Sequence, residues 1–560
     1  MLISYLQYRR ACEQKQRERA TRIARLPESY HISLGDTDVN ILNAPVSTTV
    51  ANVQDGAWVP IDVLRAYARK ALAAHAQTNC LTEVMLEDAE KWATAIASSM
   101  LGMTGPLAGM PVSLKDTVAV AGYDACLGYA AWVGHRVQRD SGLVRLLRDA
   151  GAIPFVKTGI PTTLLSFESV SGVFGRVVNP HNSAYSPGGS SGGEAALLAL
   201  GGSRIGIGTD VAGSVRVPAH YSGVYSIRAS AGRFLKMGNA SSMPGQEGVP
   251  AVCSPMARTL GDLETFWKAI FQMEPWKYDH TVLHMPWKSV DLSPKVKFGV
   301  MWGVVPLSPA CRRALATVVE NLKISGYEVV DFTPPNPCEG LQIASQLLLA
   351  DGGKTAFAPL LWGEPNDIGM ASAHAWLRLP RILQRIYVQW VRYVRREPLY
   401  ASLLEGFHEQ SMDEYYKLVA QREGCRARWF EEWNQAQLDF LLTAPNALPA
   451  VPNGGMKRGW KVCGYSFLFN LLDYTAGVLP ITKVDAVHDA LAPAAYKELQ
   501  AANVVARDAF VMYDAQKMAG LPVGVQVVGQ RLEEEKVLAG MQLVEQVMRE
   551  RGCVYEPLSV

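Results

Sequence analysis

From about Gly109 onward, short apolar runs bounded by glycine and proline alternate with longer amphipathic runs. Bounded apolar runs of about four to eight residues are typical of buried strands, and the amphipathic runs have the period of helices. Strands that alternate with helices in this way predict an α/β fold with a mainly parallel sheet. We therefore expect a large, mixed, mainly parallel central sheet covered by helices on both faces.

The apolar and amphipathic runs also place individual elements. Strands are expected at 111–114, 153–156, 204–208, 296–301, 326–330 and 520–528. Helices are expected at 141–150, 194–200, 309–324 and 533–549. The run 477–481 contains Pro480, which lacks the N–H that a central strand donates, so we expect an edge strand or a loop there.

Residues 1–100 differ from the rest of the chain in their helical pattern. Helices are expected at 9–25, 61–76 and 82–99. Asp62 and Thr82 are suitable N-cap residues for the last two. We expect this N-terminal helical flank to pack on an α/β domain at 101–560, which carries a helical insertion near 370–435. No linker clearly divides the chain, so the prediction is one large domain overall.

Composition excludes several classes of protein. The chain has 560 residues, of which 49% are apolar and 19% are charged, as in an ordinary globular enzyme. Its net charge of +2 creates no field that would attract nucleic acid. No apolar run reaches the roughly 20 residues of a membrane-spanning helix, and the apolar stretch at the N-terminus is too short for a signal peptide. We expect a cytoplasmic protein without a transmembrane segment.

Neither a metal site nor a cofactor site is predicted. Nine cysteines are scattered along the chain without a C-x-x-C pair, which favours reduced thiols. His280 and His284 are four residues apart, but no glutamate accompanies them as in the H-E-x-x-H zinc motif. The glycine-rich segments lack the G-K-[ST] ending of a phosphate-binding loop.

The segment 376–400 is unusually basic. It carries six arginines and no acidic residue before Glu397, and its apolar residues follow at helical spacing. The simpler interpretation is a core-packing helix with a solvated basic face. The alternative is a lid over a substrate entrance or a contact with a membrane surface.

Two glycine-rich segments carry serines in a pattern that points to chemistry. They are Ser186-Pro-Gly-Gly-Ser-Ser-Gly-Gly-Glu194 and Gly208-Thr-Asp-Val-Ala-Gly-Ser-Val-Arg216. A serine hydroxyl needs an adjacent base to act as a nucleophile. No histidine lies in a catalytic-looking context, but Lys115 lies in Val112-Ser-Leu-Lys-Asp116, and a buried lysine with a lowered pKa can act as a base. A structural alternative for the first segment is a helix-capping box formed by Ser191 and Glu194.

Together these motifs resemble the amidase signature family. The resemblance is dense over about 105–260 and reappears at 469–480 and 520–526. Its later segments resemble the branch that holds fungal acetamidases and fatty-acid amide hydrolases. The motifs that carry the dense part are Pro111-Val-Ser-Leu-Lys-Asp116, Gly151-Ala-Ile-Pro-Phe-Val-Lys-Thr158, Phe174-Gly-Arg-Val-Val-Asn-Pro180, both serine segments and Ser254-Pro-Met-Ala-Arg258.

The resemblance implies the amidase signature fold and a Ser-Ser-Lys triad. Ser214 is then the nucleophile that forms the acyl-enzyme, and Lys115 is the ultimate base. Ser190 bridges the two and follows a cis peptide bond. The oxyanion of the attacked amide is expected to bind the backbone N–H groups of Val211, Ala212, Gly213 and Ser214.

Four further residues are expected to support this centre. Ser191 and Asp210 are expected to orient the network by hydrogen bonds, and Arg216 to pair with Asp210 or another buried acid. Leu164 matches a family position that lines the acyl site, although plain core packing explains a leucine equally well.

The sequence departs from the family pattern at two places. Ala212 replaces a glycine that is common in this run, so the oxyanion site is altered if that position needs a backbone angle reserved for glycine. The segment Ser169-Val-Ser-Gly172 lacks the asparagine often found before the Phe-Gly pair, which bears on substrate preference more than on catalysis.

The function expected from the resemblance is hydrolysis of non-peptide carboxamides, giving a carboxylate and ammonia or an amine. The expected partner is a small-molecule amide; no nucleic acid is expected, and a homodimer is compatible with the sequence. One alternative is a glutamine-dependent amidotransferase subunit, which the long N-terminal helices and the segment 471–477 argue against. Another is a non-catalytic binding protein that keeps the fold, which the joint presence of Lys115, Ser190 and Ser214 disfavours.

Overall fold

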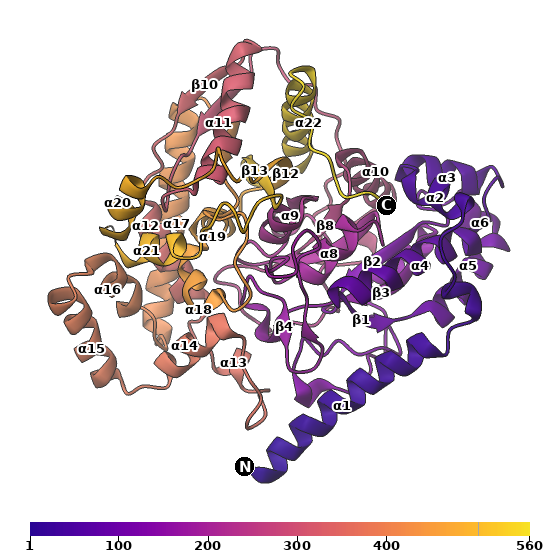
Figure 1. The fold of residues 1–560 in the computed structure, drawn as a ribbon, viewed down its shortest axis with the longest axis horizontal. Helices are drawn as coiled ribbons and strands as arrows, with labels where there is room; N and C mark the ends of the chain where they lie inside the picture. Colours follow the sequence, from indigo (N-terminus) through magenta and orange to yellow (C-terminus); the bar gives the residue numbers. More distant parts are fainter. Residues whose placement is uncertain (502) are drawn as a thin grey trace.

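The computed structural model describes residues 1–501 and 503–560 (Figure 1). One sheet of eleven strands, in the order β1–β3–β2–β6–β8–β7–β12–β13–β11–β9–β10, runs through the molecule. Its strands are β1 Leu81–Val84, β2 Pro111–Lys115, β3 Ile153–Thr158, β6 Ile205–Asp210, β7 Tyr225–Arg228, β8 Val252–Ala257, β9 Lys297–Val300, β10 Glu328–Asp331, β11 Phe440–Thr443, β12 Ala476–Lys483 and β13 Pro522–Val528. The six strands expected from sequence are all present, each within a few residues of its expected range.

The sheet is mixed, as expected, but parallel pairing is confined to its two flanks. On one flank β2 pairs in parallel with β3 and β6, and on the other β9 pairs in parallel with β10 and β11. The middle strands, from β6 through β8, β7, β12 and β13 to β11, pair antiparallel, as does β1 with β3. The expectation of a mainly parallel sheet is therefore wrong for the centre. A parallel return needs a helical crossover, and the connection 229–251 between β7 and β8 is irregular.

Strand β12 corrects a second expectation. It is eight residues long and lies between β7 and β13 in the middle of the sheet, where an edge strand or loop was expected. Pro480 pairs with Gly524, and the register shifts between Pro480 and Thr482. The ladder is thus irregular where the proline lacks its N–H, which is how a central strand tolerates this residue.

Helices surround the sheet on either side (Figure 1). Those expected from sequence are α7 Gly142–Asp149, α8 Gly192–Ala199, α11 Pro309–Ile324 and α22 Glu534–Glu550. Two others accompany them, α9 Arg216–Ser222 and α10 Leu260–Gln272. Helix α8 is buried along its whole length, which places the glycine-rich segment before it inside the molecule.

The N-terminal region is helical, with one correction. Its helices are α1 Leu2–Ala24, α2 Asp36–Asn43, α3 Val46–Gln54, α4 Pro60–Thr78, α5 Leu86–Ala97 and α6 Met100–Thr104. The expected helix 82–99 begins instead with β1, whose four buried residues pair with β3. Thr82 is therefore not an N-cap, because its hydroxyl lies in a strand and donates to Asp116 at 2.9 Å. Asp62 lies inside α4, whose N-cap position is Val59.

The middle of the chain supplies a group of helices beside the sheet. They are α12 Pro337–Leu348, α13 Lys354–Phe357, α14 Ile368–Leu377, α15 Arg381–Gln389, α16 Pro398–Glu405, α17 Met412–Gln435, α18 Met456–Gly459, α19 Gly464–Leu472, α20 Pro493–Ala501 and α21 Val504–Phe510. Helices α15 and α16 extend away from the sheet at the lower left of Figure 1. In the part of the chain that the structure describes, no helix is both long and apolar enough to span a membrane.

Helix α15 and the π-helical turn Trp390–Val394 bear out the core-packing interpretation of the basic segment on one face only. Ile382, Tyr393 and Val394 are 68%, 72% and 67% exposed. Val388 and Val391 are instead buried against Ala401 and Leu404 of α16. The segment thus packs on its neighbouring helix through one face and exposes apolar side chains on the other, where it extends beyond the layer of helices that covers the sheet.

Candidate active site

The site lies at the ends of two neighbouring strands. Because β2 and β6 pair in parallel, their carboxyl ends, Lys115 and Asp210, lie at the same edge of the sheet. Ligands of open α/β sheets bind at this kind of edge. The turn that leads into α8 brings Ser190 and Ser191 to the same place, and the segment after β6 brings Ser214 there.

Lys115 is buried and lies between two hydroxyl groups. Its Nζ is 2.8 Å from Oγ of Ser190 and 2.7 Å from Oγ1 of Thr209. Burial lowers the pKa of Lys115 to about 7, although the carboxylates of Asp210 and Glu194 oppose this shift. A lysine in this state is neutral in a large fraction of molecules near neutral pH. The sequence analysis assigns no role to Thr209, although it stands next to Asp210 in the second serine segment.

The two serines before α8 have different contacts. The peptide bond between Gly189 and Ser190 is cis, as the resemblance implies. The N–H of Ser191 donates to the carbonyl of Ser214 at 3.1 Å, which ties the two serine segments together. The hydroxyl of Ser191 donates to the carbonyl of Thr209 at 3.4 Å.

The capping box expected at Ser191 and Glu194 is not formed. The side chain of Ser191 makes no cap hydrogen bond to α8. Glu194 is buried and instead accepts hydrogen bonds from the hydroxyls of Ser113 and Thr158, the latter at 2.7 Å. It lies within reach of β2 and β3 because α8 packs directly on the sheet, and burial raises its pKa to about 7.

Asp210 organises the segment that follows β6. Its carboxylate accepts from the N–H of Gly213 at 2.8 Å and from the N–H of Val215 at 3.2 Å. It also pairs with Arg216 at 3.1 Å, as expected. Burial alone would raise the pKa of Asp210, but the Arg216 charge and hydrogen bonds hold it well below its usual range. The N–H of Gly213 is thus engaged by Asp210 and is not free for an oxyanion in this arrangement, which corrects one of the expected donors.

Helix α19 holds the same segment from the other side. The hydroxyl of Ser466 donates to the carbonyl of Ala212 at 2.8 Å. One turn further on, the amide of Asn470 donates to Asp210 at 2.8 Å and accepts from Arg216 at 2.5 Å. Residues four apart lie on one face of a helix, so a single face of α19 supports the segment. Sequence reasoning did not assign a role to Ser466 or Asn470.

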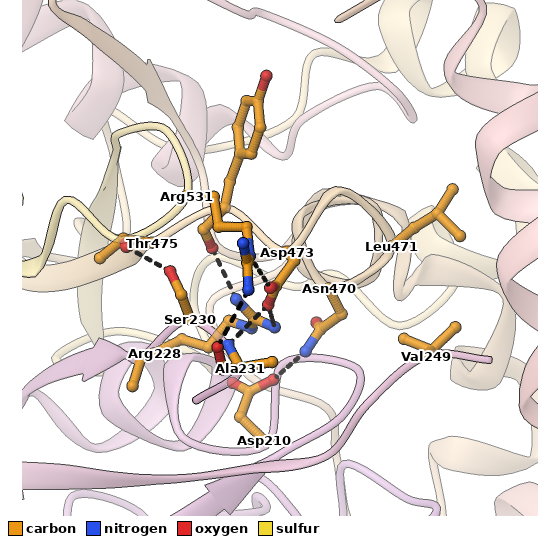
Figure 2. A network of polar contacts seen from close by, with 12 residues as sticks. Asp210, Arg228, Ser230, Ala231, Val249, Asn470, Leu471, Asp473, Thr475 and Arg531 are labelled. Carbon is orange, nitrogen blue, oxygen red and sulfur yellow. Dashed lines mark hydrogen bonds and ion pairs between the residues drawn. The ribbon is translucent and has the colours of Figure 1, made fainter. Parts of the chain in front are cut away.

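The end of α19 is fixed by a second charged cluster, which Figure 2 shows beside Asp210 and Asn470. Asp473 accepts from Arg228 at 2.9 Å and from Arg531 at 2.8 Å. Because Arg228 belongs to β7 and Arg531 follows β13, the cluster ties α19 to the centre of the sheet.

Ala212 and Gly213 have different backbone requirements. Ala212 is not among the described residues with a positive φ, so this position does not reserve its backbone for glycine. Gly213 has φ +115°, and a Cβ there would collide with Oγ of Ser466. The departure from the family pattern at Ala212 is therefore compatible with the geometry of the segment.

A cavity of about 170 Å³ opens beside Ser214. Most of its wall is apolar and comes from helices α12, α14, α16 and α19. Leu164 and Val211 border it together with Ser214, and the role of Leu164 at an acyl site stays a prediction. The lining side chains contributed by the helices and by the segment after α16 include Leu341, Leu348, Met370, Ala373, Leu403, Leu404, Phe407 and Phe467.

A second, smaller cavity of about 50 Å³ also borders Ser214. Ser190, Thr209 and Ser214 all border it.

Among the described residues, no group of three or more histidines, cysteines, aspartates or glutamates is placed to hold a metal ion.

Comparisons with known proteins agree with the fold and the motifs. The family model described as Amidase matches residues 62–538. The chain is 32% identical over 535 residues to an acetamidase of Aspergillus oryzae, covering 92% of this chain and 91% of that protein. It is 30% identical over 546 residues to fatty-acid amide hydrolase 1 of Sus scrofa, covering 96% and 92%. A solved structure of a fatty acid amide hydrolase superposes with a TM-score of 0.84 at 27% identity, covering 97% of this chain and 95% of that one.

Proposed function

The chain belongs to the amidase family and is an amide hydrolase, and we propose that it works through Lys115, Ser190 and Ser214 with a seryl acyl-enzyme. The observation that carries the proposal is the position of Lys115. The side chain of Lys115 is buried and has a pKa of about 7. Its Nζ lies 2.8 Å from Oγ of Ser190, and Ser190 and Ser214 both border the small cavity. A base with a pKa near the working pH is suited to proton transfer.

The acylation step follows from this arrangement. Oγ of Ser214 attacks the amide carbonyl carbon, its proton passes to Ser190, and the proton of Ser190 passes to neutral Lys115. The C–N bond then breaks, the amine nitrogen takes a proton from Ser190, and Lys115 returns its proton to Ser190. The acyl group stays on Ser214 as an ester, and ammonia or an amine departs.

Deacylation uses the same groups with water in place of Ser214. A water molecule attacks the ester carbonyl and gives a proton through Ser190 to Lys115. The bond to Oγ of Ser214 breaks, Oγ takes a proton from Ser190, and Ser190 regains one from Lys115. The carboxylic acid product loses its proton to the medium and leaves as the carboxylate.

The negative charge on the carbonyl oxygen needs hydrogen-bond donors. The backbone N–H groups of Val211, Ala212 and Ser214 are the proposed donors. Gly213 acts indirectly, since its N–H bonds to Asp210 and its positive φ shapes the segment. Ser191, Asp210 and Arg216 are proposed to hold the segment and not to react.

The test is covalent labelling of the serine. A fluorophosphonate should label the wild-type protein at Ser214, and Ser214→Ala should abolish both labelling and amide hydrolysis. Hydrolysis by the chain alone also separates this function from an amidotransferase subunit, which needs a partner. Undiminished turnover in Ser214→Ala would contradict the proposed nucleophile.

For the acyl group, we propose an apolar chain or ring larger than acetyl. An engineered apolar cavity of about 150 Å³ holds a benzene ring, and the cavity beside Ser214 measures about 170 Å³. Each buried methylene contributes about 0.8 kcal/mol. In a series of primary amides, kcat/KM should rise roughly twofold to fourfold per carbon from acetyl to about hexanoyl. A fall along this series would contradict the proposal.

For the arm at 376–400, we propose peripheral contact with an anionic membrane surface. The exposed apolar side chains of α15 and the following turn stand among exposed arginines, which is the composition of a membrane-surface helix. Helices α14 and α16, on either side of α15, border the apolar cavity. The protein should sediment with vesicles that contain phosphatidylserine and less with pure phosphatidylcholine, and Ile382→Asp with Ile386→Asp should remove the difference. If this variant sedimented with the phosphatidylserine vesicles as strongly as the wild type does, the contact would be contradicted.

A further inference from the structure

A third cavity lies at the opposite edge of the sheet from the reactive serines. It measures about 280 Å³ and is bordered by β7, the end of β8, the start of α10, β12, α22 and the C-terminal tail at 553–557. Because β8 runs antiparallel to β6, Arg258 after β8 lies at the other end of this strand pair from Asp210. In the part of the chain that the structure describes, no residue of this wall borders the two cavities beside Ser214.

Arg258 is the unusual residue of this wall. Five arginines of the described residues are more than nine-tenths buried. Four of them pair with a carboxylate: Arg204, Arg216, Arg228 and Arg233. Arg258 is 7% exposed and forms no ion pair with any residue that the structure describes. Since arginine is almost never buried without a paired charge, the missing counter-charge of Arg258 calls for an explanation.

The contacts of Arg258 compensate only part of its charge. Its Nη1 donates to the carbonyls of Leu198 and Ala199 at 3.0 and 2.6 Å, and its Nη2 donates to the carbonyl of Leu558. The first two carbonyls end α8, and a helix C-terminus carries about half a negative elementary charge. Burial lowers the pKa of Arg258 to about 10, and the charge of Arg204 adds to this shift, but the guanidinium stays charged at neutral pH. The carbonyls thus hold the side chain in place without neutralising it.

Two polar groups of the wall remain available to a ligand. A guanidinium has five N–H donors, and the three carbonyls leave the Nε–H of Arg258 without a hydrogen bond to any described residue. Tyr555 also borders the cavity, and its buried hydroxyl has no hydrogen-bond partner within the described chain. Both observations favour a ligand that accepts hydrogen bonds.

The remaining charges of the wall leave one positive charge in excess. Glu545 is the acidic residue of the wall. Its carboxylate is occupied by the hydroxyl of Tyr225 at 2.7 Å and by Arg549 at 3.3 Å. Arg258 and Arg549 together therefore exceed Glu545 by one charge, which matches a ligand with a single negative charge.

The rest of the wall is mostly apolar. Leu260, Leu479, Ile481 and Met548 border the cavity, and each is buried. An engineered apolar cavity of about 150 Å³ holds the six carbon atoms of benzene, so a cavity of about 280 Å³ has room for roughly ten non-hydrogen atoms. A small inorganic anion would leave most of this space and the apolar side chains uncovered.

We propose that this cavity is a binding site for a medium-chain aliphatic carboxylate, whose head group pairs with Arg258 and whose chain packs on the apolar wall. The head group accepts the N–H donors of Arg258 that the carbonyls leave free, and a guanidinium pairs well with the two oxygens of a carboxylate. Octanoate, with ten non-hydrogen atoms, has the expected size. Binding involves neither Ser214 nor the proposed reaction, so the inference goes beyond the proposed function.

Cys553 borders the cavity and gives a local signal for binding. Its alkylation by iodoacetamide is followed by mass spectrometry of the peptide that contains it. At an octanoate concentration about tenfold above Kd, roughly nine-tenths of the molecules are occupied, so alkylation of Cys553 should slow about tenfold. At the same concentration, 1-octanol has the chain without the charge and inorganic phosphate has the charge without the chain, so neither should slow it.

The variants are compared by the ratio of alkylation rates with and without octanoate. Arg258→Gln removes the charge and keeps an amide donor for the carbonyls, so the protection of Cys553 should be lost. Arg549 is 68% exposed, so Arg549→Glu weakens the attraction without disturbing the fold and should reduce the protection even if Arg258→Gln does not fold. Arg551→Glu makes the same change of charge outside the wall and should match the wild type.

Cys463 separates this site from the acyl cavity, which it borders. Its alkylation in the same digest reports octanoate bound near Ser214, and this response should be the same in Arg258→Gln as in the wild type.

Four results would overturn the inference. The first is an alkylation rate of Cys553 that octanoate does not change. The second is equal slowing by 1-octanol or by phosphate, because either would remove one half of the proposed ligand chemistry. The third is protection that persists in folded Arg258→Gln, and the fourth is equal protection in Arg549→Glu and Arg551→Glu.

Discussion

Lys115 and Glu194 are two buried side chains whose pKa values lie near 7, and only one of them is proposed to carry protons in the reaction. Burial lowers the pKa of the lysine because the charged form loses its hydration, and it raises that of the carboxyl for the same reason. Neutral lysine is the reactive form, so kcat/KM should fall about tenfold per pH unit below pH 7. A pH profile of the wild-type protein measures this acidic limb, which is the fall of kcat/KM below pH 7.

Glu194→Gln is the control for assigning this limb to Lys115 and not to Glu194. The amide keeps the shape of the carboxyl and cannot titrate, so the limb should persist. It should move to lower pH, because a charged Glu194 raises the pKa of Lys115 and the variant removes that charge. Disappearance of the limb in Glu194→Gln would assign it to the carboxyl and contradict Lys115 as the base.

Neighbouring positions in the segment after β6 should respond differently to a change of one methyl group. Gly213→Ala places a Cβ against Ser466 at a backbone φ of +115°, so the proposed oxyanion donors beside it are displaced. The loss of one such donor costs about 100-fold or more in kcat, and we expect a loss of this order. Ala212→Gly should stay within roughly threefold of the wild type, because this position carries no positive φ. Steady-state kinetics of the two variants, with circular dichroism to confirm folding, make the comparison; equal losses would contradict the geometry.

At the scale of single elements, α19 contacts the serine segment through one face and the apolar cavity through another. Ser466 contacts the segment that carries Ser214, while Phe467 borders the apolar cavity. Ser466→Ala removes a hydrogen bond worth about 1 kcal/mol, so kcat should fall about fivefold to tenfold with KM nearly constant. Phe467→Leu should instead raise KM for a hexanoyl amide and leave kcat nearly constant. The same effect on KM in both variants would show that the two faces do not act separately.

The elements also show which features of the fold can be predicted from a local sequence pattern. Strands such as β2 and β6 were predictable because each is a short, mainly apolar run bounded by glycine or proline, the pattern that predicts a buried strand. Lys115, Ser190 and Ser214 could be proposed as the reactive centre from the sequence because each stands in a distinctive local motif. The sequence predicts the start of a helix where strand β1 lies, because Leu81–Val84 is short and continuous with the helical pattern of α5.

Contacts between distant parts of the chain were not predictable. Ser466 is 254 residues from Ala212, and Asn470 is 260 residues from Asp210. Nothing in either local pattern distinguishes these side chains from ordinary polar residues of a buried helix. The hydrogen bonds of Glu194 with β2 and β3 belong to the same class, because they depend on how α8 packs on the sheet.

At the scale of the whole molecule, a buried charge fixes the N-terminal helix to the fold. Lys15 of α1 is buried and pairs with Glu83 of β1 and with Asp124, the latter at 2.8 Å. Removing one partner of a buried ion pair costs about 3–5 kcal/mol. Amide hydrogen exchange over residues 2–24 should therefore speed up about 100-fold or more in Lys15→Ala.

The exposed pair of Lys91 and Asp88 supplies the comparison. Lys91 is 73% exposed and lies 2.7 Å from its partner. Pairs of this kind contribute about 0–1 kcal/mol, so exchange in Lys91→Ala should match the wild type. Unchanged exchange of α1 in Lys15→Ala would contradict the anchoring role of the buried pair.

The complete burial of α19 has a consequence for how this enzyme can acquire new substrates. A substitution that moves the backbone of this helix also shifts Ser466 or Asn470, and hence the serine segment, so it lowers turnover. Only a trimmed side chain that leaves the helix in place, as in Phe467→Leu, changes the acyl cavity without this loss. Helices α14 and α16 border the cavity without such bonds to that segment among the contacts of the described residues. Evolution and engineering should therefore find tolerated changes of acyl preference in α14 and α16, and α19 should vary least among variants that remain active.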